Sequence, residues 1–201
     1  MADWDKDSRQ LRQNLARVLA EIVSAGERRA TPALETARRW QSVVMQGLDV
    51  PAPKFVGAFR GEPGLETLQV QVGVHNGVNS AGLAEALARF EEKLQRLVAE
   101  LDEHLPIEQK ADADQLAAII DLCAWVHAEW MRMHPFANGN GRTACLWANS
   151  IAMRYGLPPF VRLRPRPNTG YGDAGAKAMQ GDWKPTAVVF RTMLADLLDE
   201  L

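Results

Sequence analysis

Apolar side chains recur at steps of three and four residues along most of the chain, which is the pattern of amphipathic helices. Glycines and prolines fall at the ends of these stripes, where helices usually begin or end. The helices predicted in this way cover residues 8–25, 32–46, 81–103, about 116–134, 140–156, 173–180 and from 185 to the end. Helix–helix packing should therefore form most of the core.

Residues 54–78 follow a different pattern. The apolar residues of 68–74 alternate with polar residues or glycine, and a period of two predicts a strand. Residues 55–60 can form its partner across a turn at 62–64, which contains proline and glycine. The sequence therefore predicts one β-hairpin on a helical protein, and the unpaired edge of such a hairpin is able to bind an extended segment.

The stretch from His134 to Arg142 carries an unusual concentration of chemical groups. The helix that arrives at His134 should end there, because a residue before proline is disfavoured in the α conformation, and Gly139 and Gly141 allow a tight turn. A helix that begins at Asn140 would direct its amide groups and its positive dipole end into this loop, which suits a phosphate. The His134 imidazole can take a proton from a hydroxyl. This stretch therefore predicts a base beside a phosphate-binding loop.

Composition and charge narrow the class of protein. With 201 residues, of which 47% are hydrophobic, the chain can bury the core of one domain. The formal net charge of −2 gives no electrostatic basis for binding nucleic acid or an anionic membrane. No apolar run approaches membrane-spanning length, and we expect a cytoplasmic protein. Cys123 and Cys145 lack the spacing of a zinc site or a disulfide framework.

Residues 134–142 resemble the signature of the Fic (filamentation induced by cyclic AMP) domain family, H-P-F-x-[D/E]-G-N-G-R-x-x-R. The matching residues are His134, Pro135, Phe136, Gly139, Asn140, Gly141 and Arg142. Two positions depart from the signature: Asn138 replaces the acidic residue, and Cys145 replaces the second arginine. Most of the signature is therefore present.

The resemblance implies a mainly α, Fic-type helical bundle with one β-hairpin flap before the signature. Residues 1–50 resemble the family only in being helical. We therefore expect an N-terminal helical extension over residues 1–50, packed on a Fic-like catalytic domain over residues 51–201, in one compact unit.

The resemblance also implies a nucleotidyltransferase of the AMPylation type, which moves AMP from ATP to a Ser, Thr or Tyr hydroxyl of a target protein. His134 would be the catalytic base, and Phe136 would anchor the motif in the core. The residues expected to bind the phosphates are Gly139, Asn140, Gly141 and Arg142. The flap residues expected to hold the target segment are Arg60, Gln69, Val70, Gln71 and Val72. The family also leaves room for an inhibitory or antitoxin partner.

The two departures bear on the donor and on its metal ion. The side chain of Asn138 offers Mg²⁺ a neutral oxygen in place of a carboxylate, so we expect a weak or indirect metal site. Cys145 gives the terminal phosphate of ATP no positive charge, and a lost charge-assisted contact costs about 1.5–3 kcal/mol. Three interpretations remain: an AMP transferase of reduced activity, a transferase for another phosphate-containing donor, and a degenerate module that binds nucleotide or protein without catalysis.

Two further segments have alternative interpretations. Arg162, Arg164 and Arg166 either reach a terminal phosphate in place of the missing arginine or form a solvated loop. Residues 31–36 resemble the first half of the inhibitory motif of Fic proteins, [S/T]-x-x-x-E-[G/N]. A capping role for Thr31 beside a solvated Glu35 is the favoured interpretation of that segment.

Overall fold

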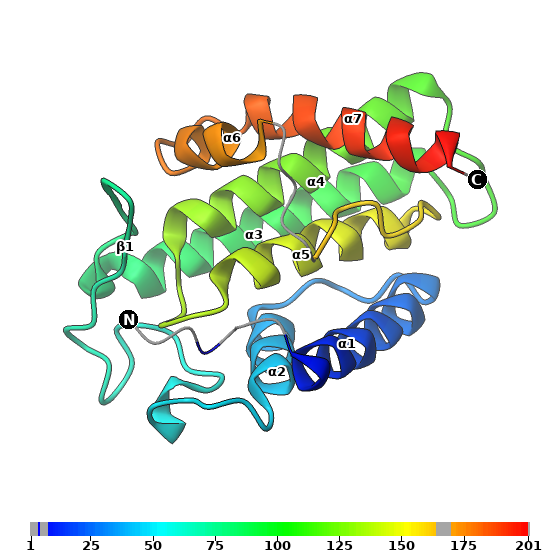
Figure 1. The fold of residues 1–201 in the computed structure, drawn as a ribbon. Helices are drawn as coiled ribbons and strands as arrows, with labels where there is room; N and C mark the ends of the chain where they lie inside the picture. Colours follow the sequence, from blue (N-terminus) through cyan, green and yellow to red (C-terminus); the bar gives the residue numbers. More distant parts are fainter. Residues whose placement is uncertain (1–3, 5–7, 164–169, 201) are drawn as a thin grey trace.

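The computed structural model describes residue 4 and residues 8–163 and 170–200. The helices in this part of the chain are α1 (Arg9–Glu27), α2 (Leu34–Met45), α3 (Ser80–His104), α4 (Ala113–Met133), α5 (Asn140–Arg154), α6 (Tyr171–Ala178) and α7 (Lys184–Asp199) (Figure 1). Each of them lies where an apolar stripe predicted a helix, so the mainly helical fold is confirmed. None of these described helices is both long enough and apolar enough to cross a membrane.

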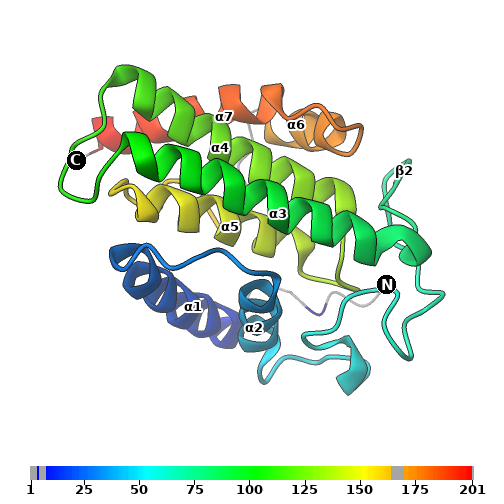
Figure 2. The same cartoon turned by 180° about the vertical axis from the view of Figure 1, so that it is seen from behind.

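The helix α4 lies in the middle of the bundle and packs against α3, α5, α6 and α7. Its sequence explains this position, because buried residues occur on nearly every side of its second half. Figures 1 and 2 show α6 and α7 along one side of the bundle and α1 and α2 along the opposite side, against α5. The loop that joins α4 to α5 therefore starts and ends in well-buried helices.

A cluster of aromatic rings fills the core beneath that loop. The fully buried Trp130 has its ring centroid 5.5 Å from that of Phe90 and 5.8 Å from that of Trp147. The rings of Phe59 and Phe136 join the same cluster at 6.2 Å and 5.9 Å from Trp130. Tilted and edge-on contacts at these distances are favourable between aromatic rings. The cluster fixes the backbone on both sides of the loop.

The predicted pairing of residues 55–60 with residues 68–74 is wrong. The hairpin consists of β1 (Gln71–Val72) and β2 (His75–Asn76), and residues 53–55 form a 3₁₀ turn instead of a strand. Phe59 makes an isolated antiparallel bridge with Phe136, because its side chain is drawn into the aromatic cluster. The alternation in residues 68–74 marks no buried face, since the side chain of Val74 is 85% exposed.

The start of α2 also differs from the prediction. Thr31 is not its N-cap; the helix begins at Leu34, whose amide group donates a hydrogen bond of 2.7 Å to the Glu91 carboxylate on α3. A negative group at this position complements the helix dipole. Glu35 follows with a side chain that is 85% exposed and pairs with Arg38. Its place at the start of α2 supports the interpretation as a solvated residue.

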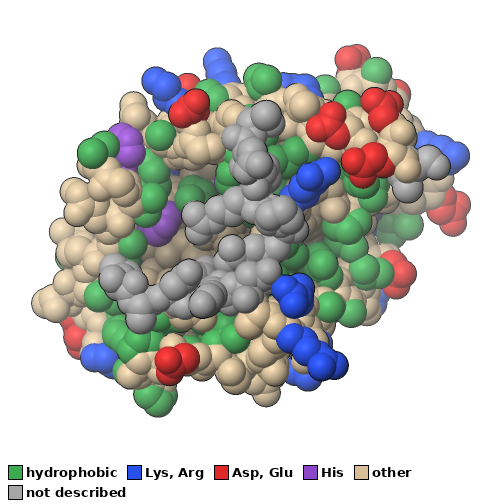
Figure 3. All heavy atoms as spheres, in the orientation of Figure 1, with side chains coloured by type: hydrophobic (Ala, Val, Ile, Leu, Met, Phe, Trp, Pro, Cys, Tyr) green, Lys and Arg blue, Asp and Glu red, His purple; other side chains and the backbone are tan. Residues whose placement is uncertain are grey.

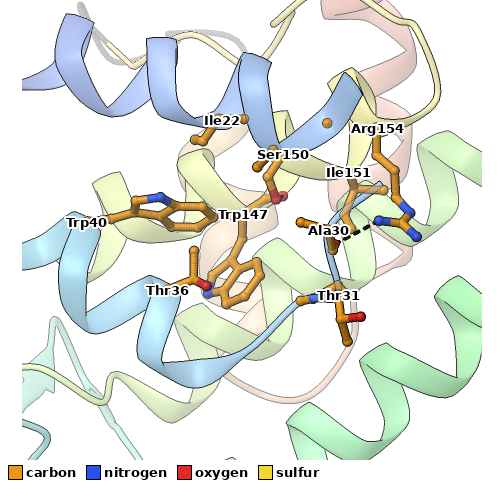
Figure 4. A pocket seen from close by; sticks show the side chains of 12 residues that line it. Ile22, Ala30, Thr31, Thr36, Trp40, Trp147, Ser150, Ile151 and Arg154 are labelled. Atoms are coloured by element: carbon orange, nitrogen blue, oxygen red, sulfur yellow. Dashed lines mark hydrogen bonds between the residues drawn. The ribbon is translucent and has the colours of Figure 1, made fainter. Parts of the chain in front are cut away.

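A polar cluster closes the opposite end of the bundle. Asp102 on α3 pairs with Arg154 at the end of α5 and with Arg29, and it accepts a hydrogen bond of 3.0 Å from the Tyr155 hydroxyl. Arg154 also donates to the carbonyl of Ala30, beside a cavity of about 70 Å³ between α1, α2 and α5 (Figure 4). These contacts hold the connection between α1 and α2 against α3 and α5.

Candidate active site

The loop between α4 and α5 begins with an unusual backbone conformation at His134. The helix α4 ends at Met133, and His134 has φ 48° and ψ 57°, in the left-handed region. This conformation costs a residue other than glycine roughly 1–2 kcal/mol, and it persists only where the surroundings enforce it. The following residue is Pro135, which disfavours the right-handed helical conformation at His134. The conformation turns the chain away from the axis of α4.

A hydrogen bond to the backbone fixes the His134 ring in one tautomer. Its Nδ1 lies 2.5 Å from the carbonyl oxygen of Met131, and a carbonyl can only accept, so Nδ1 carries the hydrogen. The Nε2 of the neutral ring is then the unprotonated nitrogen. Burial lowers the pKa of His134 most; the hydrogen bond to Met131 raises it, and the charge of Arg60 lowers it again. The net lowering favours a neutral ring near pH 7, which is the form that accepts a proton.

The side chain of Asn140 stabilises the loop itself. Its Oδ1 accepts a hydrogen bond of 2.8 Å from the Phe136 amide group, and its Nδ2 donates one of 2.8 Å to the Phe136 carbonyl. The residue is 4% exposed. We expected this side chain to bind phosphate, but both of its polar groups are used inside the loop. The backbone amide of Asn140, in the first turn of α5, fits the phosphate-binding role, and the role expected of the side chain stays a prediction.

The start of α5 has the geometry of an anion site. Gly139 precedes the helix with φ 86°, and the Thr143 amide makes the first intrahelical hydrogen bond, to the carbonyl of Gly139. The amide groups of the residues in between point out of the helix end by construction. A Cβ on Gly141 would meet nothing within 4 Å, so there is open space beside this turn. The buried Arg142 brings a positive charge to the same turn.

Two residues of α2 support the loop, although no motif in the sequence selects them. Gln41 is fully buried: its Oε1 accepts a hydrogen bond of 2.6 Å from the Gly57 amide, and its Nε2 donates to the Asn138 carbonyl at 3.4 Å. A Cβ on Gly139 would lie 2.8 Å from the Met45 methyl group. The signal in the sequence was a single glutamine within the apolar stripe of a helix, which alone is too weak to predict a site residue.

The predicted flap residues separate into two groups. Gln71 and Val72 lie exposed in β1, and the carbonyl of Val70 accepts a hydrogen bond from the amide of Gly77 at the base of the hairpin. Gln69 donates from its side chain to the Ser80 hydroxyl at 2.7 Å, which fixes the hairpin to α3. Arg60 does not lie on the hairpin; it is 1% exposed, so the prediction that it lies on an exposed target-binding edge is wrong.

The corner that the signature assigns to a second arginine is occupied by a chain of hydrogen-bonded side chains. The Cys145 sulfur lies 3.3 Å from the Tyr171 hydroxyl, which lies 2.8 Å from Nε2 of His127. Burial lowers the pKa of His127 to about 3, so this ring is neutral. Arg162 pairs with Glu200 at 3.8 Å, near the end of α7. Arg164 and Arg166 lie outside the described residues.

The place expected for a metal ion offers few ligands. Asn138 is half-buried, and its backbone carbonyl is the group that accepts from α2. The described part of the chain contains no group of three or more His, Cys, Asp or Glu side chains that could hold a metal ion. The Asn138 amide oxygen alone fits Mg²⁺ only if phosphate oxygens and water complete the coordination.

Figure 3 shows how charge is distributed on the face seen in Figure 1. Histidine side chains on this face lie toward the end that carries the hairpin, whereas acidic side chains gather toward the opposite end, over the end of α7. On this face, acidic side chains are therefore sparser at the end with the hairpin than over the end of α7.

Residues 31–152 match the model of the Fic/DOC family, and this chain belongs to that family. The match begins before α2, so this helix lies inside the family region. A protein adenylyltransferase Fic from Nematostella vectensis is 39% identical over 66 residues, which cover 33% of this chain and 15% of that protein. The one from Culex quinquefasciatus is 30% identical over 117 residues, which cover 58% and 20% of the two chains. The chain thus spans about a fifth or less of these relatives.

Solved structures share the fold. Fic-1 from C. elegans superposes with a TM-score of 0.68 at 21% identity, covering 99% of this chain and 53% of that one. A Fic domain-containing signaling protein from Bacteroides thetaiotaomicron gives a TM-score of 0.60 at 17% identity, covering 96% and 73%. The likeness to these structures supports the helical bundle with its hairpin.

Proposed function

We propose that this chain transfers AMP from ATP to a side-chain hydroxyl of a target protein. The observation that carries the proposal is the His134 ring, whose Nδ1 is fixed as a donor to Met131 and whose Nε2 is thereby left to accept a proton. The start of α5 supplies amide groups and a positive dipole end next to it in the chain. Relatives that match this region are named protein adenylyltransferases.

The reaction would proceed by in-line displacement. Nε2 of His134 takes the proton of the target hydroxyl while the hydroxyl oxygen forms a bond to the α-phosphorus of ATP. The bond from that phosphorus to the bridging oxygen breaks, and pyrophosphate leaves with the electron pair. The hydrogen bond to Met131 continues to orient the ring after it becomes an imidazolium. A neutral His134 is required at the start, and the lowered pKa provides it.

The phosphates would be held by the first turn of α5. Amide groups of Asn140 and Gly141 and the charge of Arg142 can stabilise negative charge that develops on the transferred group. When bound, Mg²⁺ would neutralise phosphate charge, with Asn138 as a ligand or a water-mediated contact. The exposed edge of β1, at Gln71 and Val72, would align the target segment as an added strand.

A donor other than ATP is the second candidate, and Cys145 favours it. This residue is 5% exposed and hydrogen-bonded to Tyr171, so the signature position itself supplies no guanidinium for a terminal phosphate. A donor that lacks a terminal phosphate has no negative charge to be paired there, so it would lose nothing at this corner. Cytidine diphosphate choline is a suitable probe of this class.

The test is transfer of label to protein in a lysate or to the chain itself, from ATP labelled at the α-phosphate and from cytidine diphosphate choline labelled in its phosphocholine group. Wild type should transfer label from ATP, and His134→Ala should abolish transfer because no base remains. His104→Ala is the matched control, since that histidine is exposed at the end of α3. Transfer from another donor alone would support the second candidate. Nucleotide binding without transfer from any donor would contradict both and leave a non-catalytic module.

A further inference from the structure

Arg60 makes an unusual set of contacts for a buried guanidinium. Its Nε donates to the carbonyl of His134 at 2.7 Å, and its Nη2 donates to the carbonyl of Met133 at 2.9 Å. The Nη2 also donates to the Val78 carbonyl at 2.7 Å, and Nη1 donates to the Leu68 carbonyl at 3.2 Å. All four partners belong to the main chain.

No acidic side chain among the described residues pairs with Arg60. Its charge is therefore balanced by carbonyl dipoles, and two of them belong to the C-terminal end of α4, where unsatisfied carbonyls and the negative end of the helix dipole favour a cation. The backbone adds a further bond, from the Arg60 amide to the Pro135 carbonyl at 2.8 Å. Arg60 thus binds three successive carbonyls, those of residues 133, 134 and 135.

The other two partners flank the hairpin. Leu68 precedes β1, and Val78 follows β2, so one guanidinium joins both ends of the hairpin segment to the end of α4. Gly77 lies in the same contact: a Cβ there would be 3.1 Å from the Arg60 guanidinium and 2.9 Å from Cβ of His134. The segment that would present a target and the histidine that would deprotonate it are thereby held in one frame.

Building on the proposed function, we propose that Arg60 is a positioning residue that fixes the left-handed His134 and both ends of the hairpin relative to each other. It acts through His134 and touches neither reacting atom. Arg60 lies on an irregular connection, 74 residues before His134, and nothing in its local sequence marks it as part of the loop. Its positioning role follows from its five hydrogen bonds to backbone carbonyls. The proposed reaction requires these backbone segments to keep their positions.

The charge of Arg60 adds a second effect that packing alone would not produce. It lowers the pKa of His134 in addition to burial. Among the described charged or titratable groups, Arg142 lies in the first turn of α5, the mutually paired Glu129 and Arg132 lie near the end of α4, and His75 lies in β2. Removal of the Arg60 charge should therefore raise the pKa of His134, so the rising limb of the pH–rate profile should move to higher pH.

The experiment compares Arg60→Lys, Arg60→Met and Arg60→Gln with a buried arginine at the far end of the bundle, Arg154→Met. The first readout is the NMR titration of the His134 ring, assigned by its absence in His134→Gln, which needs no activity. The second is AMP transfer as a function of pH and of target concentration. Arg154 serves as control because it is 9% exposed and its guanidinium is also held by hydrogen bonds, to Asp102 and to the Ala30 carbonyl.

We expect Arg60→Met to lower transfer near neutral pH on the order of tenfold to a hundredfold and to move both the titration and the rising limb upward. Arg60→Lys keeps the charge, so the rising limb of its pH–rate profile should stay near that of wild type. Its turnover should nevertheless fall, and its KM for the target should rise. Arg154→Met should lower thermal stability and leave the limb in place. Arg60→Gln replaces Arg60→Met if the latter does not fold.

An unchanged His134 titration in a folded, uncharged Arg60 variant would overturn the proposal. The proposal would also be overturned if Arg60→Lys and the uncharged variant both kept the turnover of the wild type. If wild-type protein transfers no nucleotide, the proposed function fails by itself, and the NMR titration still decides whether Arg60 controls His134.

Discussion

Gly77 packs directly against His134: a Cβ on Gly77 would lie 2.9 Å from Cβ of the histidine. Real Cβ contacts are essentially never this short, so Gly77→Ala must displace the hairpin base or the histidine. Gly77 has no positive φ, so its backbone accepts alanine and the effect is steric. We expect transfer to fall about tenfold to a hundredfold with a smaller loss of stability.

The control for this substitution is Gly82→Ala. Gly82 lies in the first turn of α3, where an added Cβ meets nothing within 4 Å. Kinetics and thermal unfolding of both variants measure the difference. Full activity in Gly77→Ala would show that the contact with His134 does not set the position of the base.

Gly141 allows nucleotide binding and folding to be separated. Alanine in place of glycine inside a helix stabilises by about 0.5–1 kcal/mol, and the space beside Gly141 is open. We expect Gly141→Ala to unfold at a slightly higher temperature and yet to bind ATP more weakly, because phosphates would approach this turn closely. Gly139→Ala should instead destabilise the protein, since Gly139 has φ 86° and lies against Met45. Isothermal titration with ATP and thermal unfolding test both; unchanged ATP affinity in Gly141→Ala would exclude phosphate at this turn.

Asn140→Ala should destabilise the fold. It would leave the buried amide and carbonyl of Phe136 without their side-chain partners, at a cost of about 1–3 kcal/mol for an unsatisfied group. Urea unfolding with and without ATP makes the measurement. Loss of ATP affinity at wild-type stability would restore the direct phosphate-binding role that the sequence suggested for this side chain.

Stability should fall in mild acid because of His127. Its pKa is lowered from 6.5 to about 3 by burial, so the unfolded chain binds a proton between these pH values that the folded protein excludes. The contribution of His127 is complete above pH 6.5 and decreases as the pH falls toward 3, by an amount on the order of a few kcal/mol. Urea unfolding at several pH values measures this slope.

His127→Gln keeps a hydrogen-bonding group near Tyr171 but cannot be protonated, so its stability should depend less on pH. His104→Gln, at an exposed position, is the matched control and should keep the wild-type slope. An equal slope in His127→Gln would assign the acid sensitivity to other groups.

The helices and the loop could be predicted from the sequence because their signals are local. Apolar stripes fixed the helices to within a few residues, and Pro135 with the neighbouring glycines marked the loop between α4 and α5. The capping error at Thr31 has a tertiary origin, since the group that binds the start of α2 is Glu91 on another helix.

What the sequence could not give depends on contacts between distant segments. Residues 55–60 were expected to pair with residues 68–74, but Phe59 pairs with Phe136, and the burial of its ring outweighs pairing with the nearby strand. The resemblance to the family flap assigns Arg60 to the edge that holds the target. Its carbonyl partners become visible only when α4 and the hairpin are brought together. The partners of the Asn140 side chain likewise become visible only in the folded loop, where the side chain binds the amide and the carbonyl of Phe136.

The hydrogen bonds of Gln41 have a practical consequence for dissecting this protein. A truncated chain that begins at residue 51 would contain the whole signature and could therefore be taken for a complete catalytic unit. It would nevertheless lose the side chain that holds Gly57 and the Asn138 carbonyl, together with the Met45 contact at Gly139. Such a truncated chain should be inactive even if it folds, and its lack of activity would give no information about the chemistry of His134.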